Sequence, residues 1–176
     1  TLTYLDENTR EAIVEVMGAK ALARQLHDLS TDDAIDIIEE LEDDALADVL
    51  AALSAEDRVL VEEVLSFPED SAGRLMQREI VTVPSFWTVG QTIDYLRGGK
   101  SPTDDFYLIF VVDPARKLLG EVPLSKLLCA QRPRRISEIM EPDFRSIPVD
   151  MDQEEVAVLF RRYGMVSAGV VDLGDR

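Results

Sequence analysis

The amino-acid sequence predicts an α+β chain of several domains, in which a superhelical stack of short α-helices precedes two tandem β-α-β-β-α units. Three observations lead to this fold class. Leucines recur every 12 residues in the first part of the chain, short β-branched segments alternate with helical patterns after residue 70, and this second part repeats itself. Strands that alternate with short helices favour a layered fold over a purely helical one.

The 12-residue repeat marks a series of short helices. Its most regular positions are Leu29, Leu41, Leu53 and Leu65. Ser30 and Ser54 each stand three positions before an acidic residue, which is the pattern of a helix start. Helices of about two to three turns bury too little apolar surface to be stable alone, so we expect them to stack on one another over residues 5–66.

A connection containing proline and glycine, at residues 66–73, separates the helices from the alternating part. The β-branched residues 80–83 predict a short strand, and Thr88 predicts the start of a helix. Two further strands and a helix complete this unit, at residues 106–112, 118–122 and 124–129. Cys129, the only cysteine of the chain, is expected to be a small buried residue of that helix.

The same order of elements restarts near Ile136. The segment 110–113 reads Phe-Val-Val-Asp, and the segment 169–172 reads Gly-Val-Val-Asp at the matching place. The second copy ends where a turn and a further strand should follow, so we expect it to be incomplete. These patterns predict three domains, over residues 1–70, 71–135 and 136–176.

Negative charge is concentrated in the helical part. The chain has 35 acidic and 18 basic residues, a net charge of −17, and residues 28–70 hold 16 acidic residues against one basic residue, Arg58. Such a surface repels the phosphates of nucleic acids and of anionic lipids. It attracts cations or a basic protein partner.

Motifs of catalysis are missing from the sequence. With His27 as its only histidine and Cys129 as its only cysteine, the chain excludes two-histidine metal motifs and Cys/His nucleophile pairs. No apolar run approaches the roughly 20 residues that cross a bilayer. We expect a chain that is not an enzyme, with no catalytic residues and no membrane segment of its own.

Carboxylates spaced four residues apart are the candidate metal ligands. On a helix this spacing puts both side chains on one face, where their repulsion is relieved by a divalent cation. Hard divalent cations prefer oxygen ligands of this kind. For any single residue, a solvated acidic helix face is the better explanation. The acidic stretch as a whole favours cation binding, because it contains almost no Lys or Arg. The candidate pairs are Asp32 with Asp36, Asp44 with Asp48, and Asp28 with Asp32.

Several segments together carry a resemblance to known families. The strand order with its Val-Val-Asp strand ends resembles CBS domains. The segment 71–76, Ser-Ala-Gly-Arg-Leu-Met, followed by Trp87-Thr-Val89, resembles the junction between the helical and CBS domains of MgtE magnesium channels. Residues 152–156, Asp-Gln-Glu-Glu-Val, are similar to the second CBS domain of that family. The resemblance covers residues 20–172.

The resemblance implies a cytosolic Mg²⁺-sensing region, on the cytoplasmic face of the inner membrane, that dimerises through its CBS domains and continues into a transmembrane pore. Bridging Mg²⁺ ions would draw the helical and CBS domains together and close the pore. Asp172 matches a ligand position of the family. Gly174 stands where relatives supply a glutamate, so this metal site is expected to be incomplete or altered.

Two alternatives remain open from the sequence. CBS domains often bind adenine nucleotides through a hydroxyl and an aspartate, but Pro123 and Lys126 occupy those places in the first copy, and neither accepts a hydrogen bond from a ribose. The pair could nonetheless be an adenine-nucleotide sensor of another transporter or enzyme. The helical stack also resembles the fold of a flagellar motor switch protein, which makes a pure protein-interaction module the other alternative.

Overall fold

The computed structural model describes residues 17–99 and 106–176, so the part of the predicted helix stack before residue 17 lies outside the described residues. The chain forms two compact units, each described by itself below. The helical unit comprises the described residues up to Glu69 together with Arg74–Arg78. The second unit comprises Asp70–Gly73 and Glu79–Arg176.

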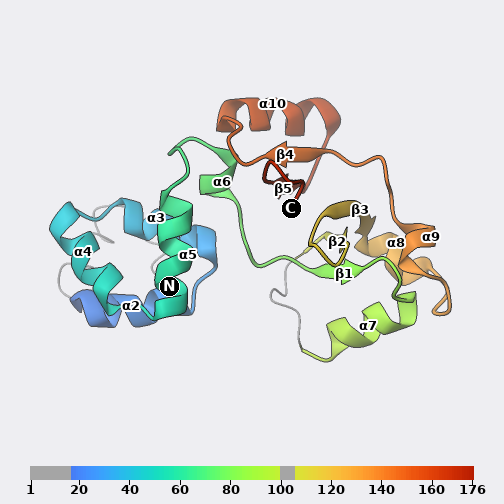
Figure 1. Cartoon of the computed structure of the whole chain (residues 1–176), viewed down its shortest axis with the longest axis horizontal. Coiled ribbons are helices and arrows are strands. Elements are labelled where there is room, and N and C mark those ends of the chain that lie inside the picture. The colour runs from blue at the N-terminus through green and yellow to red at the C-terminus, as the bar shows by residue number, and fades with distance from the viewer. Residues whose placement is uncertain (1–16, 100–105) are drawn as a thin grey trace. The chain divides into compact units, whose positions relative to one another are not determined.

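The described part of the helical unit up to Glu69 contains four short helices: α2 (Ala19–His27), α3 (Thr31–Glu39), α4 (Asp43–Ala52) and α5 (Ala55–Leu65) (Figure 1). They pack around a shared apolar core that includes Leu22, Ile35, Ile38, Val49 and Val64. The leucines of the 12-residue repeat pack against this core and are partly buried. The stack of short helices that the repeat predicts is therefore confirmed.

The predicted helix starts are found, with one difference in detail. The Ser54 side chain accepts a hydrogen bond of 3.1 Å from the Asp57 backbone N–H, as the pattern predicts. Ser30 also precedes its helix, but its side chain makes no capping hydrogen bond. Asp32 and Asp33 instead place negative charge in the first turn of α3, which favours the helix dipole without a side-chain cap.

The first repeat of the second unit contains a three-stranded sheet. Strand β1 (Thr82–Pro84) runs parallel to β2 (Leu108–Val112), which pairs antiparallel with β3 (Leu118–Pro123). Helices α7 (Val89–Arg97), α8 (Leu124–Cys129) and α9 (Ile136–Ile139) belong to the same core. Thr88 and Gln91 form a reciprocal capping box at the start of α7, which confirms the predicted helix start.

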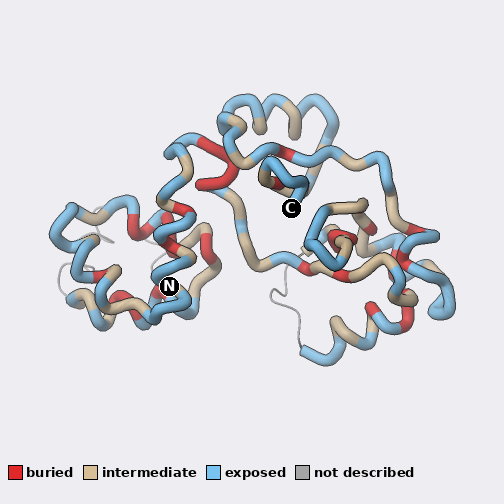
Figure 2. The backbone as a smooth tube through the Cα atoms, in the orientation of Figure 1, coloured by how far each residue is buried: buried red, intermediate tan, exposed pale blue. Residues whose placement is uncertain are grey.

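The second repeat is smaller. Strand β4 (Ser146–Pro148) pairs parallel with β5 (Gly169–Val171), and helix α10 (Gln153–Tyr163) connects them. A single-turn helix, α6 (Ala72–Leu75), lies in the connection before the first repeat. None of the residues of α10 is buried, as its pale blue and tan tube in Figure 2 shows. The mixed α+β fold with a helical first part is thus confirmed.

Cys129 is exposed, contrary to the expectation of a buried side chain. Helix α8 has only six residues and buries only Leu127. Two residues further along a helix, a side chain points to the opposite side of the axis, because each residue turns by about 100°. The buried position of Leu127 therefore directs Cys129 outward.

None of the described helices combines the length with the apolar character that crossing a membrane requires.

Candidate functional site

Helix α3 carries Asp32 and Asp36 one turn apart, as predicted. The pairing of Asp28 with Asp32 on one helix face is wrong, because α2 ends before Asp28 and α3 begins only at Thr31. Asp36 is exposed, whereas Asp32 is partly buried in the first turn. The Oδ1 atom of Asp32 is buried and accepts no hydrogen bond from the described residues. A buried carboxylate oxygen without a donor costs free energy, and a bound cation removes that cost. Of the predicted ligands, Asp32 is the one whose surroundings fit a cation best.

Helix α4 carries the second pair on its solvent-exposed surface. Asp44 and Asp48 are both exposed, and the only buried residue of the helix is Val49. Their spacing of four residues puts both carboxylates on one helix face. The pair can supply two oxygen ligands to a hydrated ion.

Larger clusters of ligand groups are absent from the part of the chain that the structure describes: no three or more His, Cys, Asp and Glu side chains are grouped so that they could hold a metal ion. Mg²⁺ retains several waters and needs only one or two protein carboxylates, so the pairs fit it as partial sites. Such pairs leave most coordination positions to water or to oxygen atoms from another surface.

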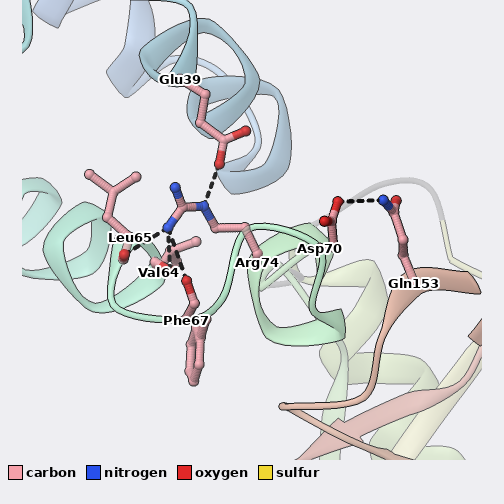
Figure 3. Close-up of polar contacts among 7 residues, drawn as sticks. All are labelled: Glu39, Val64, Leu65, Phe67, Asp70, Arg74 and Gln153. Atoms are coloured by element: carbon pink, nitrogen blue, oxygen red, sulfur yellow. Dashed lines mark hydrogen bonds and ion pairs between the residues drawn. The ribbon is translucent and has the colours of Figure 1, made fainter.

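Arg74 is a buried cation that neutralises one carboxylate of the acidic helical unit. Its side chain is 9% exposed and forms an ion pair with Glu39 of α3. The same guanidinium donates hydrogen bonds of 2.7 Å to the Leu65 carbonyl and 3.2 Å to the Phe67 carbonyl (Figure 3). These carbonyls lie at the end of α5, where a positive charge complements the helix dipole. Arg74 thereby fastens the end of α5 to α3.

Arg78 neutralises a second carboxylate of the helical unit. Its Nη1 atom lies 2.9 Å from Oε2 of Glu63, and this hydrogen bond lowers the pKa of the Glu63 carboxyl. Both arginines follow the acidic stretch in sequence, so a count over residues 28–70 misses them. The uncompensated charge of the helical surface is therefore carried by other carboxylates, including Asp44 and Asp48.

Asp172, the predicted ligand of the second repeat, closes a turn. Its Oδ1 atom accepts hydrogen bonds from the backbone N–H groups of Arg176 (3.0 Å) and Gly174 (2.7 Å), which lower the pKa of the carboxyl. The Arg176 guanidinium also lies 2.9 Å from Oδ2. Oδ1 thus already accepts two hydrogen bonds and Oδ2 is paired with the guanidinium, and the metal role of Asp172 stays a prediction.

Asp113 forms the same turn at the matching Val-Val-Asp of the first repeat. Its Oδ1 accepts from the backbone N–H groups two and four residues on, at Ala115 (2.8 Å) and Lys117 (2.9 Å). Arg116 and Asp175, the residues just before the turns close, both have a positive φ, of 65° and 60°. The two repeats therefore share their turn geometry in detail.

A cavity of about 810 Å³ lies in the second unit, within the size range of small-molecule sites. Its wall includes Tyr107, Glu121, Pro123, Arg145 and Tyr163. The Arg145 guanidinium lies over the Tyr163 ring, 3.7 Å from its centroid. A cation stacked on an aromatic ring beside an open cavity can receive an anionic group and a flat ring.

The fold is that of CBS-domain proteins. The cystathionine β-synthase (CBS) pair domain of a proposed Mg²⁺ transporter from Shewanella oneidensis superposes with a TM-score of 0.62, at 20% identity, over 85% of this chain and 87% of that chain. At that level of identity the likeness establishes the fold alone. The chain therefore has the fold of CBS-domain proteins together with an acidic helical unit.

Closer relatives establish the family. Residues 1–70 match the family model described as the MgtE intracellular N domain. The magnesium transporter MgtE of Thermus thermophilus is 35% identical over 144 residues, which cover 73% of this chain. The crystal structure of the cytosolic domain of the Mg²⁺ channel MgtE in complex with ATP superposes with a TM-score of 0.90, at 32% identity, over 99% of this chain and 72% of that chain. The chain belongs to the MgtE family of magnesium transporters.

The chain spans between a quarter and about a third of the length of the curated transporters that it matches, from 25% to 37%. The matched structure is the cytosolic domain of its channel. Membership of a transporter family agrees with the expectation that the chain is not an enzyme.

Proposed function

We propose that this chain is the cytosolic, Mg²⁺-sensing regulatory region of a magnesium channel or transporter, at the cytoplasmic face of the plasma membrane. The observation that carries the proposal is the helical unit of an MgtE family member, in which carboxylate pairs lie on α3 and α4 and one Asp32 oxygen is buried without a donor. Family membership favours this function over a flagellar-switch-like interaction module.

Mg²⁺ would shift the equilibrium between two arrangements, one with the helical and CBS domains apart and one with them associated. At low Mg²⁺ the carboxylates of the helical unit repel other acidic groups, and at high Mg²⁺ bridging ions favour association of the helical and CBS domains, which closes the pore. The ligands proposed are Asp32, Asp36, Asp44, Asp48 and Asp172. An ion can shift this equilibrium only by its difference in affinity for the two arrangements. The pore, its Mg²⁺ influx and a homodimer formed through the CBS domains belong to the same proposal.

A Mg²⁺ titration of thermal unfolding tests the sensor. Binding at ten times the dissociation constant stabilises the folded chain by about 1.4 kcal/mol. For a chain of this size, that is a rise of about 3–6 °C in the unfolding midpoint. K⁺ at matched ionic strength provides the control for screening, because screening is not ion-specific.

Two double variants test whether the predicted carboxylates bind the ion. D32N/D36N and D44N/D48N should lose much of the Mg²⁺-dependent rise, whereas E154Q/E155Q, which removes two exposed charges from α10, should keep it. Equal shifts with Mg²⁺ and K⁺ would reject the sensor. Equal Mg²⁺ responses in all three variants would reject these carboxylates as ligands.

The cavity of the second unit favours a second function, the binding of an adenine nucleotide. The matched MgtE cytosolic domain was crystallised with ATP. Here Lys126 is held in an ion pair of 3.1 Å with Glu141, and Pro123 has no hydroxyl, so the usual ribose contacts of the first repeat do not form. Arg145 and the rings of Tyr107 and Tyr163 would take over recognition. ATP binding that persists unchanged in R145A would contradict this assignment.

A further inference from the structure

Glu121 is a carboxylate in the wall of this cavity without a cation of its own. It lies on β3, and its backbone pairs with that of Glu141 through two hydrogen bonds, with N···O distances of 3.2 Å and 2.7 Å. This antiparallel bridge brings two acidic residues to directly opposite positions. Like charges at such positions repel each other.

The nearby cations are engaged elsewhere. Lys126 of α8 pairs with Glu141, and Arg145 stacks on the Tyr163 ring at the end of α10. Within the part of the chain that the structure describes, Glu121 forms no ion pair. The ionisable groups around it are therefore two further carboxyls, two phenols and two engaged cations: Glu141, Asp143, Tyr107, Tyr163, Lys126 and Arg145.

Burial raises the pKa of Glu121 above its ordinary value, and the negative charge of Glu141 raises it further. An anion entering the cavity adds more negative charge beside this carboxylate. Because a nearby like charge disfavours ionisation, the anion increases the proton affinity of Glu121 again.

We propose that Glu121 takes up a proton when the cavity binds a phosphate-bearing ligand, so that the affinity for this ligand rises as the pH falls. The inference rests on the nucleotide-binding function proposed above and adds a regulation to it. Because the two equilibria are linked, a ligand that promotes protonation of the protein binds more tightly as the pH falls. A single coupled proton changes the dissociation constant by at most about tenfold per pH unit.

The test uses ATP as the probe and isothermal titration calorimetry of the chain at pH 7.5 and pH 5.5, at one ionic strength. Wild type should bind ATP about tenfold more tightly at the lower pH. E121Q, which is neutral at both pH values, should bind tightly at pH 7.5 and should show only the change that the ionisation of ATP itself causes. E138Q removes an exposed carboxylate outside the cavity, and it should behave as wild type.

A second measurement needs no variant. Calorimetry of wild type in two buffers of different ionisation enthalpy counts the protons taken up on binding, and a net uptake beyond that of ATP is expected. ATP binding with the same pH dependence in wild type and E121Q, or without excess proton uptake, would overturn the inference and leave the nucleotide site standing. If none of the three proteins bound ATP at either pH, both the proposed nucleotide site and the proton uptake by Glu121 would be rejected.

Discussion

Arg74 is the one charged side chain among the buried residues of the described chain. It joins Glu39 of α3 to the carbonyls that end α5, so its removal leaves a carboxylate and at least two backbone acceptors without their donor. Breaking a buried pair from one side costs about 3–5 kcal/mol, and the partial exposure of Glu39, at 35%, reduces this.

We therefore expect R74M to lower the free energy of unfolding by about 2–4 kcal/mol, measured by urea unfolding followed by circular dichroism. R74K should lose less, because the ammonium keeps the charge but cannot reproduce the planar fork. R58A, which breaks only the exposed pair with Glu62, should cost less than about 1 kcal/mol. A loss no larger in R74M than in R58A would reject this role of Arg74.

The contacts of Arg74 could not be predicted from the spacing of residues in the sequence. Periodicity places Glu39 on a helix, and the family resemblance marks the segment 71–76 as a junction. Nothing in the local pattern pairs two residues that are 35 positions apart. The same holds for Glu121 and Glu141, whose proximity comes from a strand and a loop paired across the fold. The unpartnered Asp32 oxygen also depends on packing, although the spacing alone predicts the residue as a ligand.

At the scale of elements, the two Val-Val-Asp turns are equivalent. In each, one aspartate oxygen accepts from the backbone two and four residues on. An asparagine offers the same acceptor oxygen, whereas alanine offers none. The turn therefore depends on the oxygen, and a metal site at Asp172 depends on the charge.

This difference separates the two roles of Asp172 experimentally. D172A should lower the midpoint of thermal unfolding most and weaken the Mg²⁺ response, whereas D172N, which keeps the acceptor oxygen and loses only the charge, should lower the midpoint less and weaken the Mg²⁺ response equally. D113N provides the matched control, with the same turn chemistry and no proposed ligand. A D172N variant whose Mg²⁺ response equals that of D113N would show that Asp172 acts in the turn alone.

The turn also has a pH dependence of known sign. Hydrogen bonds to the ionised carboxyl hold the pKa of Asp172 below its ordinary value. The stability that this group contributes is present above its unfolded-state pKa, and it is lost as the pH falls through the lower folded-state pKa. D172N should not lose stability from this source on acidification, as the difference between the two acid unfolding curves would show.

Element boundaries follow from the sequence where the pattern is periodic or capped. The 12-residue leucine repeat predicts the helices α2 to α5, and Thr88 predicts the start of α7. The cavity in the second unit has no periodic signal, because its wall combines residues from β3, the end of α10 and the loop before β4. Only the assembled fold brings these segments together.

At the scale of the whole chain, charge is distributed very unevenly. The sequence carries a net charge of −17, and residues 28–70 account for most of it. A divalent cation acts on such a distribution differently from a monovalent salt, since it can be held by two carboxylates at once. The comparison of Mg²⁺ with K⁺ is thus the decisive measurement for the molecule as a whole.

The membership of Arg74–Arg78 in the helical unit bears on how such units move between proteins during evolution. The family model ends at residue 70, yet both arginines that neutralise Glu39 and Glu63 come after it. A gene fusion with its breakpoint at residue 70 would transfer an acidic helical unit stripped of these two counter-charges. A helical unit transferred together with both counter-charges must therefore extend to Arg78.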